Sequence, residues 1–191
     1  MILIGISGKR GTGKDTLANI LSLEHNFLKM SFAAELKRQV REEFKLTDEH
    51  IEGSLKAAKL PNGFTPREIM IRYGNFFRQF DTNWWIGRLF DKIASLGEFV
   101  SQTNPQHQLN VAISDVRFKN EADYIKQQGG VLVRLERKDN LNIYPTKSND
   151  ASECDLDNYA FDMTLNEEQN LNFESLRLFA NTIVWMLEKK V

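Results

Sequence analysis

The sequence lacks the features that mark several classes of protein. Among its 191 residues there is one cysteine, Cys154, which excludes an internal disulfide and a zinc site built on cysteines, and which fits a reducing cytosol. The apolar run Met1 to Ile6 is too short for a signal peptide or a membrane span, and no other run approaches that length. With 25 Lys and Arg against 26 Asp and Glu, the net charge of −1 shows no basic excess of the kind that nucleic-acid binders carry. We therefore expect a cytoplasmic protein that binds neither a membrane nor a nucleic-acid polymer.

Five short apolar segments have the composition of strands in a parallel sheet that helices cover on both faces. They are residues 2–6, 27–32, 111–114, 131–135 and 161–165. Helical periodicity predicts helices between and after them, over residues 15–23, 33–44, 84–100, 119–128 and 173–187. This alternation predicts a single α/β domain with a parallel sheet. In such sheets the site lies at the carboxyl ends of the strands.

A further helix is expected to begin at Thr65. Thr65 is a candidate N-cap, Pro66 occupies the first helical position, and Glu68 completes a capping box. The polar stretches 45–63 and 138–158 are expected to form loops, the first of which ends in a clear turn sequence.

A glycine-rich segment directly follows the first strand and precedes the first helix. Glycines allow consecutive backbone N–H groups to turn onto phosphate oxygens, and the N-terminus of the following helix adds partial positive charge. A lysine at this spacing reaches the transferred phosphate. The segment therefore predicts a P-loop that binds ATP, made of Gly8, Lys9, Arg10, Gly11, Thr12, Gly13, Lys14, Asp15 and Thr16.

The P-loop departs from the usual pattern at one position. Asp15 follows the lysine where Ser or Thr normally holds Mg²⁺, and Thr16 comes one residue later. A carboxylate can bind Mg²⁺ directly or through water. Alternatively, Asp15 is a charge that the helix dipole favours at the N-terminus. The sequence leaves both roles open.

The P-loop sequence, with Lys-Asp at its end, resembles that of the phage-type deoxynucleoside monophosphate kinases. Four further regions are similar to that family in the same order, and together they cover most of the chain. They are Ser31 to Lys37; Arg67 to Gly74 with Arg78, Asp81 and Trp85; Ile113 to Glu121; and Gly129 to Arg137 with Ala151 to Glu153. The histidine that often precedes the Ser-Glu pair in this family is absent here.

The resemblance implies a P-loop NTPase fold of the nucleoside monophosphate kinase type, with one kinase domain over residues 1–191. It implies a helical acceptor-binding insertion over about 33–105 and a lid over about 138–150. ATP is the expected phosphoryl donor, Mg²⁺ the cofactor and a deoxynucleoside monophosphate the acceptor. The implied catalytic residues are Lys14, Asp15 and Arg117, and the implied magnesium ligands are Asp15, Thr16 and Asp115. Arg137 is expected to bind ATP, and the expected acceptor-binding residues are Lys37, Arg72, Arg78, Trp85, Asp115, Arg117 and Glu153.

The residues themselves agree with phosphoryl transfer but leave several roles open. An acceptor phosphate is largely a dianion at neutral pH and needs no general base, so a site rich in arginine without a catalytic histidine is expected. Arg117 follows a strand end and its fork suits phosphate, although it is also placed to pair with Glu121. Asp115 is a candidate for a magnesium-bound water, for the acceptor sugar or for a helix cap. Trp84 and Trp85 are both candidates to stack on a base, and helical spacing places at least one of them in the core.

Three other interpretations stay open at this level. Animal-type phosphomevalonate kinases share the Gly-Lys-Arg…Gly-Lys-Asp loop, the helix Met70 to Gly74 and the segment Ser152 to Asp157. A regulatory GTPase needs a guanine-reading motif that Thr146 to Asn149 matches only in part. A non-catalytic nucleotide-binding module would keep Lys14 without an acceptor pocket. We expect small-molecule nucleotides as partners, and the sequence leaves a homodimer open.

Overall fold

The computed structural model describes residues 1–137, 154–167 and 172–189 of the chain. The chain forms two compact units. The first consists of Met1–Ser31 together with the chain from Ala94 onward, and the second is Phe32–Ile93. The expected insertion, over about 33–105, begins close to the start of the second unit. The second unit ends at Ile93, within helix α5 (Trp84–Thr103), which continues into the first unit. The expected lid over 138–150 lies outside the described residues.

The first unit is built on a parallel sheet of five described strands. In chain order they are β1 (Leu3–Gly8), β2 (Phe27–Met30), β3 (Asn110–Val116), β4 (Val131–Arg137) and β5 (Met163–Glu167). Their order across the sheet is β2-β3-β1-β4-β5, and every neighbouring pair is parallel. The five strands and their parallel arrangement confirm the predicted fold class.

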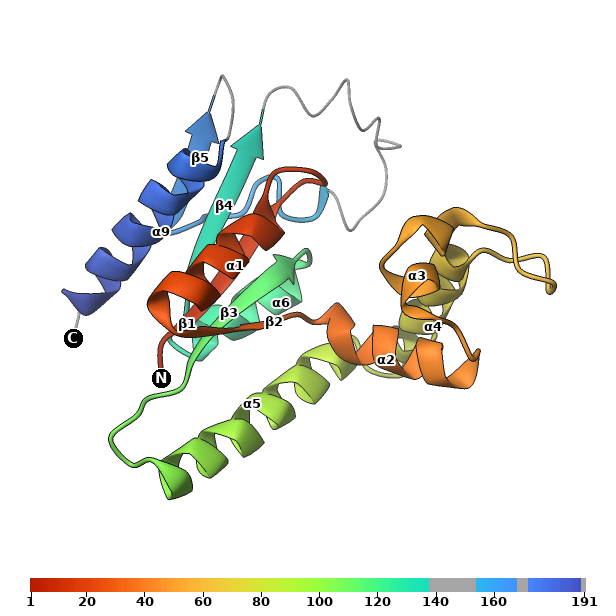
Figure 1. The fold of residues 1–191 in the computed structure, drawn as a ribbon, viewed down its shortest axis with the longest axis horizontal. Helices are drawn as coiled ribbons and strands as arrows, with labels where there is room; N and C mark the ends of the chain where they lie inside the picture. Colours follow the sequence, from red (N-terminus) through yellow and green to blue (C-terminus); the bar gives the residue numbers. More distant parts are fainter. Residues whose placement is uncertain (138–153, 168–171, 190–191) are drawn as a thin grey trace. The chain divides into compact units, whose positions relative to one another are not determined.

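Helices cover both faces of this sheet, as Figure 1 shows for the first unit. Helices α1 (Lys14–His25) and α9 (Phe173–Glu188) pack together over one face, where Ile4 and Ile6 of β1 lie in their core cluster. Helix α6 (Lys119–Gln127) covers the other face. A Cβ atom on Gly5 would lie 2.6 Å from Leu132 and 2.7 Å from Ile125. The absence of a side chain at Gly5 therefore lets α6 approach the sheet closely.

The second unit is helical. It contains α2 (Ala33–Glu43), α3 (Asp48–Ile51), the 3₁₀ helix η1 (Ser54–Ala57), α4 (Pro66–Phe80) and the first half of α5. Its core consists of Leu36, Val40, Ile51, Ile69, Met70 and Trp85. The capping box at α4 is confirmed, since Thr65 Oγ1 accepts the Glu68 N–H at 3.2 Å and the Glu68 carboxylate accepts the Thr65 N–H at 2.8 Å. The short helices α3 and η1 fall in the stretch that was expected to be a loop.

Within the described ranges, no helix is both long enough and apolar enough to span a membrane.

Candidate active site

The P-loop takes the turn that its glycines predict. Gly8 ends β1, and Gly13 is the N-cap of α1 in the left-handed conformation, with φ of 91°. Any other residue would be strained at Gly13. A Cβ atom on Gly8 would lie 2.6 Å from the Leu135 carbonyl oxygen and 2.6 Å from Thr12 Oγ1. The loop therefore passes against β4 and folds onto itself, which requires glycine at both positions.

The Lys9 carbonyl is the acceptor at the centre of the loop. Lys14 Nζ donates to it at 2.7 Å, and Thr12 Oγ1 donates to it at 2.8 Å. Lys14 is 8% exposed and Thr12 is buried, so both side chains are directed into the loop. An ammonium held at this place can exchange its carbonyl partner for a phosphate oxygen at little cost, because both partners are oxygen acceptors.

Asp15 projects into solvent from the first turn of α1. Its side chain is 79% exposed, and Oδ1 lies 2.7 Å from Lys29 Nζ, on β2. The same ammonium donates to Asn19 Oδ1 at 3.1 Å, one helical turn further along α1. The Asp15 carboxylate is therefore accessible to a cation as well as placed at the positive end of the helix dipole.

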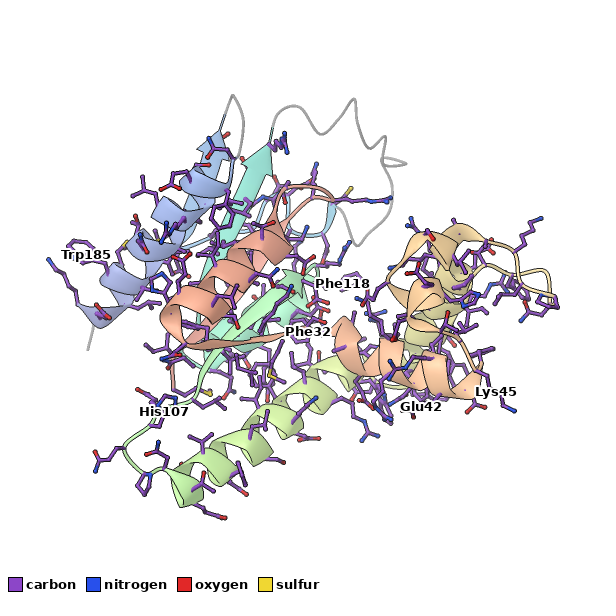
Figure 2. All side chains as sticks on the ribbon, in the orientation of Figure 1. Phe32, Glu42, Lys45, His107, Phe118 and Trp185 are labelled. Carbon is purple, nitrogen blue, oxygen red and sulfur yellow. The ribbon has the colours of Figure 1, made fainter. Side chains whose placement is uncertain are left out.

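The turn from β3 to α6 places Arg117 at the carboxyl edge of the sheet, two residues after Asp115. Phe118, labelled in Figure 2, is the residue before α6. The Glu121 carboxylate accepts the backbone N–H of Arg117 at 2.8 Å and that of Phe118 at 3.1 Å. Glu121 is only 4% exposed. Glu121, which the sequence offered as an ion-pair partner for Arg117, thus binds the backbone from which Arg117 projects.

Arg134 is a functional candidate that the sequence did not single out. It lies on β4 beside Ser7 of β1, directly before the P-loop, and is 7% exposed. Its guanidinium donates to the Leu156 carbonyl at 2.9 Å, to Asp157 Oδ1 at 2.8 Å and to Glu136 at 2.9 Å. A buried cation needs such partners. The sequence offered one local signal that could have found it, a charged residue within the alternating pattern of a predicted strand.

These elements line a small, partly open cavity at the carboxyl edge of the sheet. It is lined by Ser7, Gly8, Lys9, Val116, Arg117, Arg134 and Leu156. The cavity places Arg117 next to the start of the P-loop, where a guanidinium suits an anionic ligand, whereas Arg134 is engaged with its own three acceptors.

A protein of related sequence matches most of the chain. The chain is 37% identical to the "Putative deoxynucleotide monophosphate kinase" of Acanthamoeba polyphaga mimivirus over an aligned length of 146 residues, and the match covers 72% of this chain and 75% of the relative. The chain belongs to the deoxynucleotide monophosphate kinase family. The resemblance expected from the sequence is thereby confirmed, and the protein is a P-loop kinase. No family model matches the chain.

Solved structures confirm the fold of this family member. The chain matches dephospho-CoA kinase from Campylobacter jejuni with a TM-score of 0.54 and 14% identity, over 98% of each chain. It matches shikimate kinase from Aquifex aeolicus with a TM-score of 0.50 and 14% identity, over 99% of this chain and 98% of the other. At these identities the likeness concerns the fold of small P-loop kinases and nothing finer.

The acceptor-binding residues predicted in the second unit stay predictions. Lys37 Nζ lies 2.8 Å from Glu52, and the Arg72 guanidinium lies 4.5 Å from the centre of the Phe64 ring. Arg78 donates to Asn75 at 3.4 Å.

Trp85 is 2% exposed, and its indole N–H donates to the Gly74 carbonyl at 3.2 Å. Of the two neighbouring tryptophans, Trp85 therefore lies in the core, and this burial favours a structural role for it. Trp84 is half-buried and stacks on Phe77.

Two further predicted residues, Arg137 and Glu153, lie at or beyond the end of β4. Arg137 is the last residue of β4, and its Nε atom is buried without a hydrogen-bond partner among the described residues. Glu153 lies outside the part of the chain that the structure describes. The roles of both residues stay predictions.

Proposed function

We propose that the protein transfers the γ-phosphate of ATP to a deoxynucleoside monophosphate, which gives ADP and a deoxynucleoside diphosphate. Membership of the deoxynucleotide monophosphate kinase family is the observation that carries this proposal. The P-loop with Lys14 directed into it supports the donor half of the reaction, and Arg117 at the adjoining cavity supports an anionic acceptor. Phosphoryl transfer depends mainly on positioning and on neutralising charge, which these groups supply.

On the donor side, backbone N–H groups of the P-loop bind the ATP phosphates, and Lys14 neutralises charge on the transferred group. Magnesium commonly binds kinases through one or two carboxylates and the substrate phosphates, so no preformed cluster of ligands is required. The accessible carboxylate of Asp15 fits this requirement, with Thr16 and Asp115 as the further proposed ligands. The ion would neutralise charge on the phosphate oxygens.

On the acceptor side, Arg117 binds the acceptor phosphate from the first unit. The second unit, with the rest of α5, serves as the acceptor-binding insertion and contributes Arg78, Arg72 and Lys37, whereas the buried Trp85 supports their helices from the core. No general base is needed, because the acceptor phosphate is already largely ionised at neutral pH. His25, His50 and His107 therefore have no catalytic role in this scheme.

A substrate screen tests the proposal. The four deoxynucleoside monophosphates, their ribose forms and phosphomevalonate are each incubated with Mg-ATP, and ADP release is measured. We expect turnover with at least one deoxynucleoside monophosphate. Turnover with phosphomevalonate alone would replace the proposed acceptor, and ATP binding without turnover of any acceptor would favour a non-catalytic module.

Two variants test the acceptor side of the scheme. Arg78→Ala and Arg117→Ala should each raise the acceptor KM or lower kcat with little change in ATP affinity. The corresponding lysine variants should rescue poorly, since an ammonium cannot make the bidentate contact. Calorimetry measures ATP binding directly. If Arg78→Ala weakens ATP binding and spares the acceptor, the second unit does not hold the acceptor.

A further inference from the structure

Residues 154–157 connect three parts of the first unit. Asp155 Oδ2 accepts the backbone N–H of Lys119, at the start of α6, at 2.7 Å. The next two residues, Leu156 and Asp157, accept hydrogen bonds from Arg134 on β4 at 2.9 and 2.8 Å. The second carboxylate oxygen of Asp157 lies 3.5 Å from the Lys9 ammonium in the P-loop. We call residues 154–157 the aspartate clip.

Asp157 contacts two cationic side chains, Arg134 and Lys9, which differ in their conformational freedom. Arg134 is buried and engaged with three acceptors, so it fixes the position of the Asp157 carboxylate. Lys9 is partly exposed and carries four rotatable bonds, which gives it many accessible conformations. The charge of Asp157 therefore favours those conformations of Lys9 in which the ammonium lies beside Asp157.

Asp155 acts on the turn that carries Arg117. The Glu121 carboxylate holds the N–H groups of Arg117 and Phe118, and Asp155 holds the next one, that of Lys119. Three consecutive backbone donors are thus bound by two carboxylates, one from within α6 and one from the clip. Glu121 thus holds the backbone on both sides of the Arg117 side chain, and Asp155 holds the next N–H group along the turn.

The chain that follows the clip is itself anchored. The Tyr159 hydroxyl donates to Asp123 on α6 at 2.7 Å, and the Phe161 ring lies 5.2 Å from the Arg134 guanidinium. Burial, followed by the hydrogen bond to Asp123, raises the pKa of Tyr159 to about 12, so the hydroxyl stays a donor throughout the physiological range. The clip is therefore held at its C-terminal side by contacts with both β4 and α6.

We propose that the aspartate clip carries two positioning residues, one for each substrate: Asp157 positions Lys9 for the ATP phosphates, and Asp155 positions Arg117 for the acceptor phosphate. This inference rests on the proposed function and adds the residues that set the two phosphate-binding groups at a fixed spacing. Correct spacing matters because small displacements of positioned groups cost large factors in rate.

The two aspartates provide a matched comparison, since they are two residues apart and carry the same charge. Asp155→Ala should raise the acceptor KM about three- to tenfold, as expected for loss of a helix cap, and leave the ATP KM within about twofold. Asp155→Asn should have an acceptor KM close to the wild-type value, because an amide oxygen also accepts the Lys119 N–H. Asp157→Ala and Asp157→Asn should both raise the ATP KM about two- to fivefold, as expected for a partly exposed ion pair, because neither variant keeps the charge that attracts Lys9.

This separation of the two KM values distinguishes positioning from a merely structural role. A structural role would lower the unfolding temperature and raise both KM values together, or change neither, and either result would overturn the proposal. An unchanged or lower ATP KM in Asp157→Asn would also overturn it.

Failure of the proposed function gives a different result. If the wild-type protein turns over no deoxynucleoside monophosphate, the clip is tested without catalysis. ATP binding by calorimetry should then still weaken in Asp157→Asn, and the Lys119 amide should exchange its hydrogen faster in Asp155→Ala. Wild-type values in both measurements would overturn the role of the clip independently.

Discussion

The strongest prediction for stability concerns the buried guanidinium of Arg134. Arg134→Met removes the charge and the three hydrogen bonds while it keeps an unbranched side chain of similar reach. The change leaves the Leu156 carbonyl and the carboxylates of Glu136 and Asp157 without their partner. We expect the variant to fold, with a lower free energy of unfolding and a weakened clip.

The magnitude follows from the burial of each partner. Removing one member of a fully buried ion pair costs about 3–5 kcal/mol. Here the carboxylates of Glu136 and Asp157 are 43% and 37% exposed, so water can replace the guanidinium at both. Methionine also fills part of the vacated space with an apolar chain. We therefore expect a loss of about 1–3 kcal/mol, which is smaller than the loss for a fully buried pair.

Urea unfolding of the wild type and the variant measures this difference. Arg177→Met is the matched control, since Arg177 Nε lies 2.7 Å from Glu24 on a solvent-exposed surface of α9. A surface pair is screened by water, so this control should lose clearly less stability than Arg134→Met. Equal losses in the two variants would show that the burial of Arg134 does not determine its contribution. An unchanged ATP KM in an otherwise folded Arg134→Met protein would contradict its role in holding Asp157.

Three further predictions concern the donor site and the pH dependence of stability. Lys14→Ala should lower kcat about 10²- to 10³-fold without loss of the fold, as expected for a group that stabilises transition-state charge, and retention of more than about a tenth of the rate would refute the P-loop mechanism. Asp15→Ala should shift the Mg²⁺ dependence of the rate more than Thr16→Ala does, and an unaltered titration curve would assign Asp15 to the helix dipole instead. The hydrogen bond from Arg38 is the largest cause that lowers the pKa of Glu35 from 4.5 to about 2. Because the folded-state pKa is lowered, Glu35 stabilises the protein above about pH 4.5, and this contribution is lost as the pH falls towards 2. The pair is partly exposed, so we expect this loss of stability to be below about 1 kcal/mol. Unfolding curves at pH 5 and pH 2.5 measure it, and the stability difference between the two pH values should be smaller in Glu35→Gln than in the wild type.

Features that depend on neighbouring residues could be predicted from the sequence. The apolar run before Gly8, the glycines and Lys14 lie within a few residues of one another, and the structure shows the expected strand, loop and helix. The capping box of Thr65 and Glu68 is equally local and was found for the same reason. These patterns are recognisable because each residue acts on a neighbour along the chain.

Features that depend on distant partners were missed. Two of the three partners of Arg134 lie 22 and 23 residues later, in a stretch that was expected to be an irregular loop, so no local pattern indicated these contacts. The pairing of Asp15 with Lys29 joins a helix to the following strand and has no periodic signature. Helical spacing alone could not decide which tryptophan, Trp84 or Trp85, lies in the core, because that depends on the packing of α5 against other helices.

The two strand-to-helix turns at the carboxyl edge of the sheet differ in a way that bears on substrate binding. At the turn from β1 to α1, the N-cap is Gly13, which has no side chain to occupy the helix N-terminus, so backbone donors and the helix dipole favour an anion there. At the turn from β3 to α6, the carboxylates of Glu121 and Asp155 already bind the backbone donors and add negative charge. A phosphate at this second turn must therefore be bound by a side chain rather than by the backbone. This contrast supports the proposal that the P-loop binds the triphosphate and Arg117 the acceptor phosphate, because a guanidinium can extend beyond the two carboxylates that bind this turn.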